Sequence, residues 1–509
     1  MYGTEHMTGR RWWSNVAALL GSFIGAAVTA PESAASMETS GAGASVASYL
    51  EERVPSLMER DGIPGATIAL IEGGKVTWTQ GFGYADREDA RLMTTDTPGR
   101  PQSITKSITA WGVMTLVESG HVGLDDPVGD HITRWELPAS ELSWDAVTPR
   151  RLLSHTAGLP DGIYENYALG QQLPSLEETL SGRAGAPAAR PVEQPSSFRY
   201  SNPGYVLLEL LIEEVTGRDY GEYMQAEVLE PLAMKSANFA LEDALSDGLA
   251  TSYSLSGEAV PAYREPARAH GMLYATAQDI ATFVAAGMAG PHGEEPGRDV
   301  LDAGSVAALY AFEAEPSGFH GFGSDAQGLG HFTETLPGGE QAVMHGGQGT
   351  GSWSWYHSVP EKGAGIVILT NSERSLRFIA HVVGEWAERS GLSSVALSRI
   401  YGRVETIVQV AAAVLAAISL GLVAHLARGI RSGAIQFAPL SRRSGLPRLL
   451  IASVGIAFLA FWWAAARPVA ALLLLGLADW LSVTVSAFAA LLLAMAMFPR
   501  KVQRLRGQS

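Results

Sequence analysis

The chain has 509 residues, of which 47% are hydrophobic and 17% charged, and its formal net charge is −16. This composition excludes disorder for most of the chain, and the length allows a large domain with appendages. Residues 39–402 hold 23 Lys and Arg against 47 Asp and Glu, so this part repels nucleic acid and we expect no nucleic-acid partner. The absence of cysteine excludes disulfides, thiolate metal sites and a cysteine nucleophile.

The first thirty residues resemble a secretory signal. Arg10 and Arg11 supply a positive start, Val16–Ala30 is an apolar run, and its last residues are small enough for cleavage. We therefore predict a signal peptide at 1–30 and a linker at 31–44; an uncleaved signal anchor is the alternative.

Residues 45–395 have the patterns of one folded domain. Apolar residues recur at helical spacing over Val46–Arg60, with Pro55 inside the run. The strand-like runs Thr67–Ile71 and Val76–Tyr84 flank a Gly-Gly pair and predict a hairpin. A helix is expected to begin near Ser103 and to continue to Gly120.

The later part of the domain repeats this pattern. Leu207–Thr216 is the clearest helix of a helical and loop-rich stretch at about 125–265, and Thr276–Asp279 has a capping-box sequence. Ser352–Val359 and Ala364–Thr370 predict a second hairpin, and Arg374–Arg389 predicts a closing helix. Strands at both ends with helices between them predict an α+β fold of three layers (α/β/α): an antiparallel sheet flanked by helices, with an inserted helical subdomain.

Three apolar stretches follow, at 404–427, 449–467 and 478–498, and a membrane-spanning helix takes about 20 such residues. The segment 428–448 and the tail 499–509 carry Arg and Lys but no acid, so the positive-inside rule assigns both to the cytoplasm. The sequence thus predicts a bundle of transmembrane helices in the cell (inner or cytoplasmic) membrane, with residues 45–395 on the periplasmic or extracellular side. Buried helices of a soluble domain are the alternative. One span suffices for tethering, so three leave open a membrane protein partner.

Ser103 and Lys106 are the first candidates for chemistry. At positions i and i+3 of a helix, their hydroxyl and amine share one face within hydrogen-bonding reach. A serine hydroxyl needs a base, and a lysine can serve when burial lowers its pKa. Most Ser-x-x-Lys sequences are nevertheless solvated helix faces.

Two further short motifs contain suitable side chains. Tyr200 can relay protons, partly as phenolate when ammonium groups lie nearby, and Asn202 can fix the lysine with its carbonyl and hold a substrate amide with its NH₂. His345 precedes Gly346 and Gly347 just before a predicted edge strand, where the backbone can form an oxyanion hole. Read alone, the first motif is a loop and the second a turn.

The order and spacing of the three motifs resemble the serine β-lactamase and penicillin-binding-protein superfamily. Within it, the chain is similar to the class C β-lactamase-related branch, which includes DD-carboxypeptidases, D-aminopeptidases, family VIII esterases and amide hydrolases. The phrases Leu152–Leu159, Arg199–Tyr205 and Ile366–Asn371 fit this branch as well. The resemblance covers about 45–390.

The resemblance implies roles for individual residues. Ser103 would be the acyl-enzyme nucleophile, Lys106 its base partner and Tyr200 the proton relay. Substrate binding would fall to Asn202, His345 and Gly347. The backbone amides of Ser103 and Gln348 would form the oxyanion hole.

The sequence departs from this branch in two places. His345 stands where dedicated class C β-lactamases have a lysine, and a neutral imidazole is a weaker carboxylate anchor. The approach to the nucleophile, Thr97–Gln102, lacks the usual aromatic-Arg pair. The family-like Ser154 and His155 are interpreted as structural.

The expected function is hydrolysis of an amide or ester in a D-amino-acid peptide, a β-lactam or a small ester. A slowly deacylating penicillin-binding sensor is the alternative. No metal or other cofactor is expected, because the sequence has no clustered ligand spacing and no phosphate-binding loop. The substrate is a small molecule or peptide that the sequence does not identify.

Overall fold

The computed structural model describes residues 45–318, 320–438, 440, 445–467 and 476–499. They fall into two compact units that meet in sequence at Ile400 and Tyr401. The predicted signal peptide and linker, the tail from residue 500, and residues 439 and 441–444 of the basic segment lie outside the described residues.

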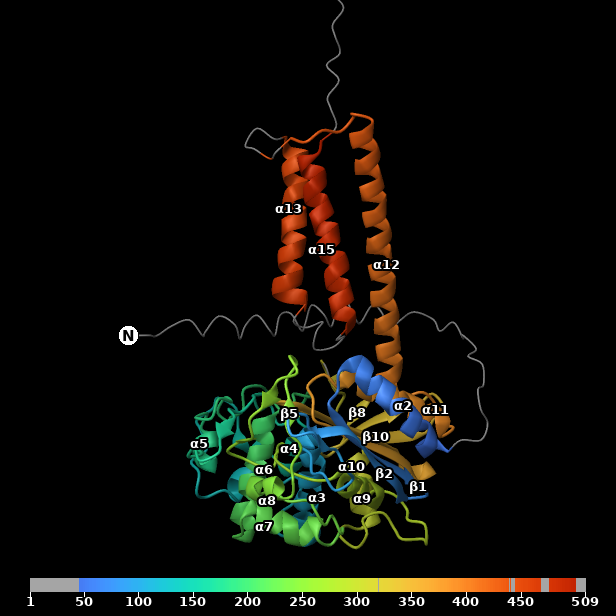
Figure 1. Cartoon of the computed structure of the whole chain (residues 1–509). Helices are drawn as coiled ribbons and strands as arrows, with labels where there is room; N and C mark the ends of the chain where they lie inside the picture. Colours follow the sequence, from blue (N-terminus) through green and yellow to red (C-terminus); the bar gives the residue numbers. More distant parts are fainter. Residues whose placement is uncertain (1–44, 319, 439, 441–444, 468–475, 500–509) are drawn as a thin grey trace, which may run out of the picture. The chain divides into compact units, whose positions relative to one another are not determined.

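An eight-stranded sheet forms the centre of the first unit (Figure 1). Its order is β3-β2-β1-β12-β11-β10-β9-β8, and neighbouring strands are antiparallel. The strands are β1 (Gly65–Glu72), β2 (Lys75–Asp86), β3 (Arg91–Leu92), β8 (Ala326–Gln327), β9 (Phe332–Thr335), β10 (Gln341–Gly349), β11 (Ser352–Val359) and β12 (Ala364–Thr370). The first and last long strands are neighbours, with Ile68 opposite Ile368.

Helices cover both faces of the sheet. Successive side chains of a strand point to opposite faces. On β11, His357 lies against Trp386 of α11 (Leu376–Arg389), whereas the Tyr356 hydroxyl lies 3.1 Å from Ser107 Oγ of α3 (Thr105–Glu118). α2 (Val46–Asp61) packs beside α11, and α9 (Ala277–Ala286) packs against β1, β2 and β12. The predicted three-layer fold is confirmed.

The inserted segment contains short helices and two small sheets. They are α4 (Pro149–Leu153), α5 (Leu176–Leu180), α6 (Asn202–Thr216), α7 (Tyr220–Met224), α8 (Leu241–Ser246), the pair β4 (Tyr167–Ala168) with β7 (Tyr263–Arg264), and the pair β5 (Ser252–Tyr253) with β6 (Ala259–Val260); α10 (Ala303–Tyr310) follows α9. One hydrophobic cluster includes Ile108, Leu207, Ile280 and Val343, so the insertion and the sheet share a core. This shared core holds α3 rigidly between them.

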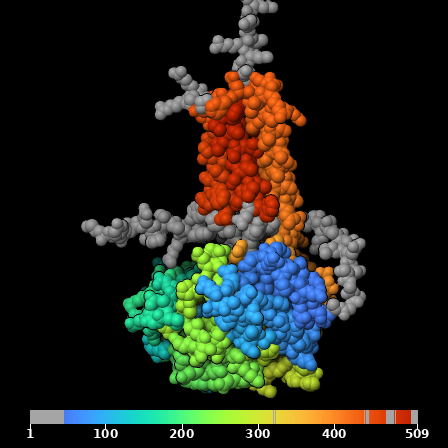
Figure 2. Space-filling model, viewed as in Figure 1, coloured from blue at the N-terminus to red at the C-terminus, as the bar shows by residue number. Residues whose placement is uncertain are grey.

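Part of the insertion also extends along the edge of the sheet. In Figure 2 the blue N-terminal part of the domain and the green segment lie side by side on one face. Arg91 of β3 donates to the carbonyl of Gly248 at 2.8 Å, and the Thr251 amide donates to the carbonyl of Ala85 in β2 at 2.9 Å. The second bond occupies a backbone carbonyl of β2 that would otherwise be open to another chain.

Most local predictions are confirmed. The helix predicted at 46–60, both hairpins and the capping box are present; Thr276 accepts from the amide of Asp279, whose carboxylate accepts from the amide of Thr276. The loop expected at 200–204 is wrong from Asn202 onward, where α6 begins. Ser201 caps that helix, and Pro203 fits its first turn because no intrahelical donor is needed there.

The second unit begins within α12 (Ala396–Arg431). It also contains α13 (Leu446–Phe461), which continues through a π-helical turn to Ala466, and α15 (Gly476–Met497). Within the described ranges, three helices are long and apolar enough to cross a membrane. α13 packs on α15, and the Trp462 indole donates to Ser482 Oγ at 3.0 Å. A Cβ at Gly455 would lie 3.2 Å from the carbonyl oxygen of Ala489, so glycine allows a close helix contact of the kind that is common in membranes.

Candidate active site

Ser103 and Lys106 lie at the start of the buried central helix. Ser103 belongs to the 3₁₀ turn η1 (Gln102–Ile104), which continues directly into α3. Lys106 Nζ lies 3.0 Å from Ser103 Oγ and donates to the backbone carbonyl of His270 at 2.5 Å. The structure thus brings the two residues of the first motif into direct contact.

Lys106 is a lysine whose proton is easily lost. Its side chain is fully buried, and this burial lowers its pKa to about 7, although attraction from Asp161 and Glu265 acts in the opposite direction. Near neutral pH, about half of the molecules therefore carry an uncharged amine beside Ser103. Such an amine can accept the serine proton.

Tyr200 contacts both Ser103 and Lys106. Its hydroxyl hydrogen-bonds to Ser103, and the centre of its ring lies 4.9 Å from Lys106 Nζ. Burial raises the pKa of Tyr200 well above its ordinary value, so the resting side chain is a neutral phenol. The expected partial phenolate is therefore not supported, because burial dominates over the nearby amine. A neutral phenol can still pass a proton between two oxygen or nitrogen atoms.

Two histidines enclose the Tyr200 ring. The His155 ring centre lies 4.3 Å away at 33°, and the His320 ring stacks at 4.3 Å and 11°. His155 Nδ1 accepts a hydrogen bond from the amide of Ser201 at 3.1 Å. His155 was expected to be structural and is indeed buried, yet it also fixes the orientation of Tyr200. The sequence offered no signal for His320.

Asn202 lies in the first turn of α6. Its Nδ2 donates to the carbonyl of Gly162 at 2.8 Å, whereas its Oδ1 is buried and accepts no hydrogen bond from the residues described. Lys106 bonds Ser103 and the His270 carbonyl instead of Asn202. These contacts are the reverse of those expected. The Asn202 NH₂ group bonds to the Gly162 carbonyl and not to a substrate, and the side-chain carbonyl is left to accept a hydrogen bond from a substrate and not from Lys106.

His345 lies inside β10, whereas the sequence placed it just before a strand. β10 pairs with β9 over 341–344 and with β11 over 343–349, so the Gly-rich stretch continues the ladder. His345 Nδ1 lies 2.7 Å from the carbonyl of Gly346, which makes Nδ1 the donor nitrogen. Nε2 is buried without a partner in the described part of the chain, and burial, followed by repulsion from Lys106, keeps the pKa of His345 far below its ordinary value. The imidazole is neutral.

Glycines allow β10 to pack closely against η1, the turn that carries Ser103 and is called the nucleophile turn below. His345, Gly347 and Gly349 are alternate residues of β10, so the His345 side chain and the Cβ positions of the two glycines lie on the same face of the strand. A Cβ at Gly347 would lie 2.1 Å from the carbonyl oxygen of Pro101, so only glycine fits there. Gln348 lies between Gly347 and Gly349, and a Cβ at either glycine would meet Gln102; the oxyanion hole expected from the Gln348 and Ser103 amides stays a prediction.

A partly buried carboxylate lies near this site and was missed by sequence reasoning. Glu265 Oε2 lies 3.3 Å from Nε2 of His270, whose carbonyl accepts the hydrogen bond from Lys106. Burial raises the pKa of Glu265 to about 7 and lowers that of His270 to about 3. Neither residue belongs to a recognisable motif, and only the folding of the insertion brings them near Lys106.

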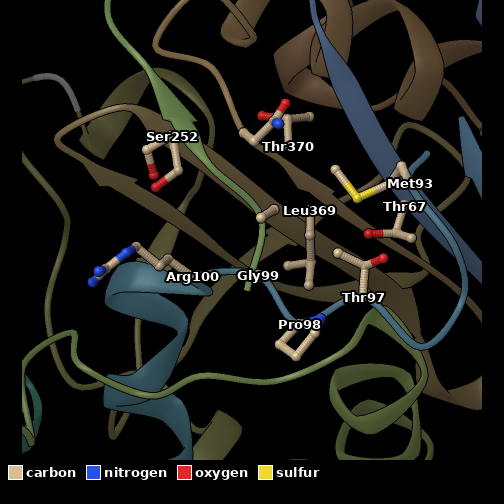
Figure 3. Close-up of a pocket in the computed structure, with 12 residues that line it drawn as sticks. Thr67, Met93, Thr97, Pro98, Gly99, Arg100, Ser252, Leu369 and Thr370 are labelled. Carbon is tan, nitrogen blue, oxygen red and sulfur yellow. The ribbon is translucent and has the colours of Figure 1, made fainter. Parts of the chain in front are cut away.

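A small pocket lies on the approach to the nucleophile. Figure 3 shows the segment Thr97–Arg100 passing Leu369 and Thr370 of β12 before the helix begins. Ser103, Lys106 and Tyr200 do not line it. Among the residues described here, no group of three or more His, Asp or Glu could hold a metal ion.

The family model named Beta-lactamase matches residues 50–381. The chain belongs to this family. Among curated relatives, Protein flp of Staphylococcus aureus (strain MW2) is 29% identical over 212 residues, which are 41% of this chain and 42% of that protein. Penicillin-binding protein 4* of Bacillus subtilis (strain 168) is 32% identical over 196 residues, which are 36% of this chain and 40% of that protein. Each match thus spans about two fifths of the relative.

Solved structures show the same fold. The octameric penicillin-binding protein homologue from Pyrococcus abyssi has 29% identity and a TM-score of 0.54, over 66% of this chain and 77% of that one. The D-amino acid amidase from Ochrobactrum anthropi SV3, in complex with L-phenylalanine, has 26% identity and a TM-score of 0.54, over 67% and 98%. The chain is therefore a member of the serine β-lactamase and penicillin-binding-protein superfamily.

Proposed function

We propose that this family member cleaves an amide or ester through an acyl-enzyme on Ser103. The observation that carries the proposal is the 3.0 Å contact between Ser103 Oγ and Lys106 Nζ, in a setting that lowers the pKa of Lys106 to about 7. An amine with this pKa is matched to proton transfer at neutral pH.

The proposed reaction has two halves. The neutral Lys106 amine takes the Ser103 proton while Oγ bonds to the substrate carbonyl carbon, and the amides of Ser103 and Gln348 stabilise the negative oxygen. The proton then reaches the leaving group through the Tyr200 hydroxyl, and the bond to that group breaks. Water subsequently attacks the acyl-serine and returns the proton to Oγ, which releases the acid.

The substrate we propose is a D-amino-acid peptide or amide, or a small ester. The similarity to a D-amino acid amidase supports the amide. The resemblance of the three motifs to a branch that includes DD-carboxypeptidases favours the peptide. His345 is neutral and supplies no cation for a substrate carboxylate, whereas Glu265 and Asp161 add negative charge near Lys106. These features favour a peptidase, amidase or esterase over a dedicated β-lactamase.

We also propose that the protein is exported and anchored in the cell membrane. The three long apolar helices support the anchor. The basic residues at 428–448 and after 499 support a cytoplasmic location for those segments, which would assign the hydrolase to the periplasmic or extracellular side.

The test uses the full chain in detergent with a panel of nitrophenyl esters, a D-alanine anilide, a D-Ala-D-Ala peptide and a chromogenic β-lactam. We expect turnover of at least one ester or amide, with the acyl group on Ser103 by mass spectrometry. Ser103→Ala should abolish both, whereas Ser119→Ala, at the far end of the same helix, should not. Turnover retained by Ser103→Ala would refute the proposal, and acylation without steady turnover would favour the penicillin-binding sensor.

A further inference from the structure

Gln102, the residue just before the nucleophile, has an unusual backbone conformation. Its φ is +53°, in the left-handed region that non-glycine residues rarely adopt. A residue held there is strained and persists only when its surroundings enforce it. Gln102 is 4% exposed, so the protein places a long polar side chain in the interior at a strained position next to Ser103.

The side-chain amide of Gln102 has specific partners. Nε2 donates to Ser352 Oγ at 2.8 Å and to the Tyr263 hydroxyl at 3.4 Å. The Tyr263 hydroxyl donates in turn to the carbonyl of Thr350 at 3.3 Å. Ser352 begins β11, and Thr350 lies in the turn from β10 to β11. The amide therefore joins the nucleophile turn to the hairpin that carries Gln348.

The neighbouring backbone is fixed to the same hairpin. Ser354 Oγ donates to the carbonyl of Pro101 at 2.5 Å. A Cβ on Gly349 would lie 2.2 Å from Cδ of Gln102, so the Gln102 side chain lies directly against β10 at that glycine. The two amides of the proposed oxyanion hole are thus adjacent in sequence to this contact: Ser103 follows Gln102, and Gln348 lies between Gly347 and Gly349.

We propose that Gln102 is a positioning residue that sets the spacing between the Ser103 and Gln348 amides. It acts through these two backbone groups and does not itself contact the substrate. The inference rests on the proposed function, because the two amides matter only if an oxyanion forms between them. Hole donors act mainly on the transition state, so a shift of their spacing lowers kcat more than it raises KM.

The test compares Gln102→Leu, Ser352→Ala and the double variant in the full chain. Leu keeps much of the volume but removes the amide. We expect kcat to fall about 10- to 100-fold in each single variant, as for a misplacement of around 1 Å, with KM changed less than about threefold. The kcat of the double variant should be little lower than that of either single variant, because both substitutions break the same contact between Gln102 and Ser352.

Two measurements separate positioning from loss of structure. Gln327→Leu removes another buried glutamine, whose Nε2 donates to the carbonyl of Gly328 at 2.8 Å, and should lower Tm without a tenfold loss of kcat. The inflection of activity near pH 7 should stay in place in Gln102→Leu, because Lys106 is untouched. If Gln102→Leu does not fold, Ser352→Ala carries the test alone.

A kcat within twofold of the parent in Gln102→Leu or Ser352→Ala, or additive losses in the double variant, would overturn the inference. Failure of the proposed function itself is distinct, because the unmodified chain would then show no turnover dependent on Ser103.

Discussion

The charge state of Lys106 should control the rate between pH 5 and pH 9. Burial lowers its pKa to about 7, and only the neutral amine accepts the serine proton. The free enzyme should therefore gain kcat/KM as pH rises through about 7 and level off above it. The side chain that relays the proton does not interfere, because the pKa of Tyr200 is raised far above this window.

The size of the effect follows from the titration. With a pKa of about 7, the neutral fraction of Lys106 is about 1% at pH 5, about 50% at pH 7 and about 90% at pH 8. We expect kcat/KM for a nitrophenyl ester to rise about 50-fold from pH 5 to pH 7 and less than about twofold from pH 7 to pH 8. Initial rates at low substrate, corrected for spontaneous hydrolysis, measure this directly.

A substitution of a neighbouring carboxylate tests whether the inflection of the pH profile belongs to Lys106. Attraction from Glu265 raises the pKa of Lys106, so Glu265→Gln should move the inflection to lower pH. Glu242→Gln, on the exposed start of α8, should leave it in place. A flat profile in the parent, an inflection close to the ordinary lysine value of 10.5, or a shift to higher pH in Glu265→Gln would refute the reasoning.

Three further predictions concern single side chains. Lys106→Met should inactivate the enzyme yet raise Tm at pH 6. The pKa of Lys106 is about 7 in the folded state and 10.5 in the unfolded state, so below pH 7 the charged amine lowers the free energy of unfolding by about 5 kcal/mol. Removing the lysine relieves this cost, and the hydrogen bonds lost with it offset only about 1–3 kcal/mol. A lower Tm would contradict this. Gly347→Ala should lower kcat at least about 100-fold, because its Cβ would lie 2.1 Å from the Pro101 carbonyl oxygen; Gly402→Ala, with no neighbour within 4 Å, is the control, and equal rates would refute the close approach. Tyr200→Phe should lower kcat about 10²- to 10⁴-fold, with a larger loss for an anilide than for a nitrophenyl ester, since only the amine leaving group needs a proton; equal losses would contradict a relay role.

The fold was predictable where local signals agree with the tertiary structure. The Gly73-Gly74 pair predicts the first hairpin because both residues have positive φ, and periodicity predicts the helix at 46–60 despite Pro55, which is exposed. α6 was missed at its start because Asn-Pro-Gly is typical of loops, although proline also suits a first helical turn.

The candidate site was predictable only in its motifs. The spacing of Ser103 and Lys106 implies their contact, and the structure shows it. The glycines after His345 suggested a turn, whereas tertiary contact with Pro101 and Gln102 requires them within a strand. Glu265 has no sequence signal, because its relation to Lys106 depends on how a distant insertion folds.

The pairing of β1 with β12 has a consequence for how the domain is made. Ala66 lies opposite Thr370, so the middle of the sheet joins residues that are synthesised at opposite ends of the domain. Such long-range pairing makes folding slow, since the chain must close a very large loop first. The sheet stays incomplete until residue 370 is available, so the turn that carries Ser103 and the strands that pack on it come together only after nearly the whole domain has been synthesised.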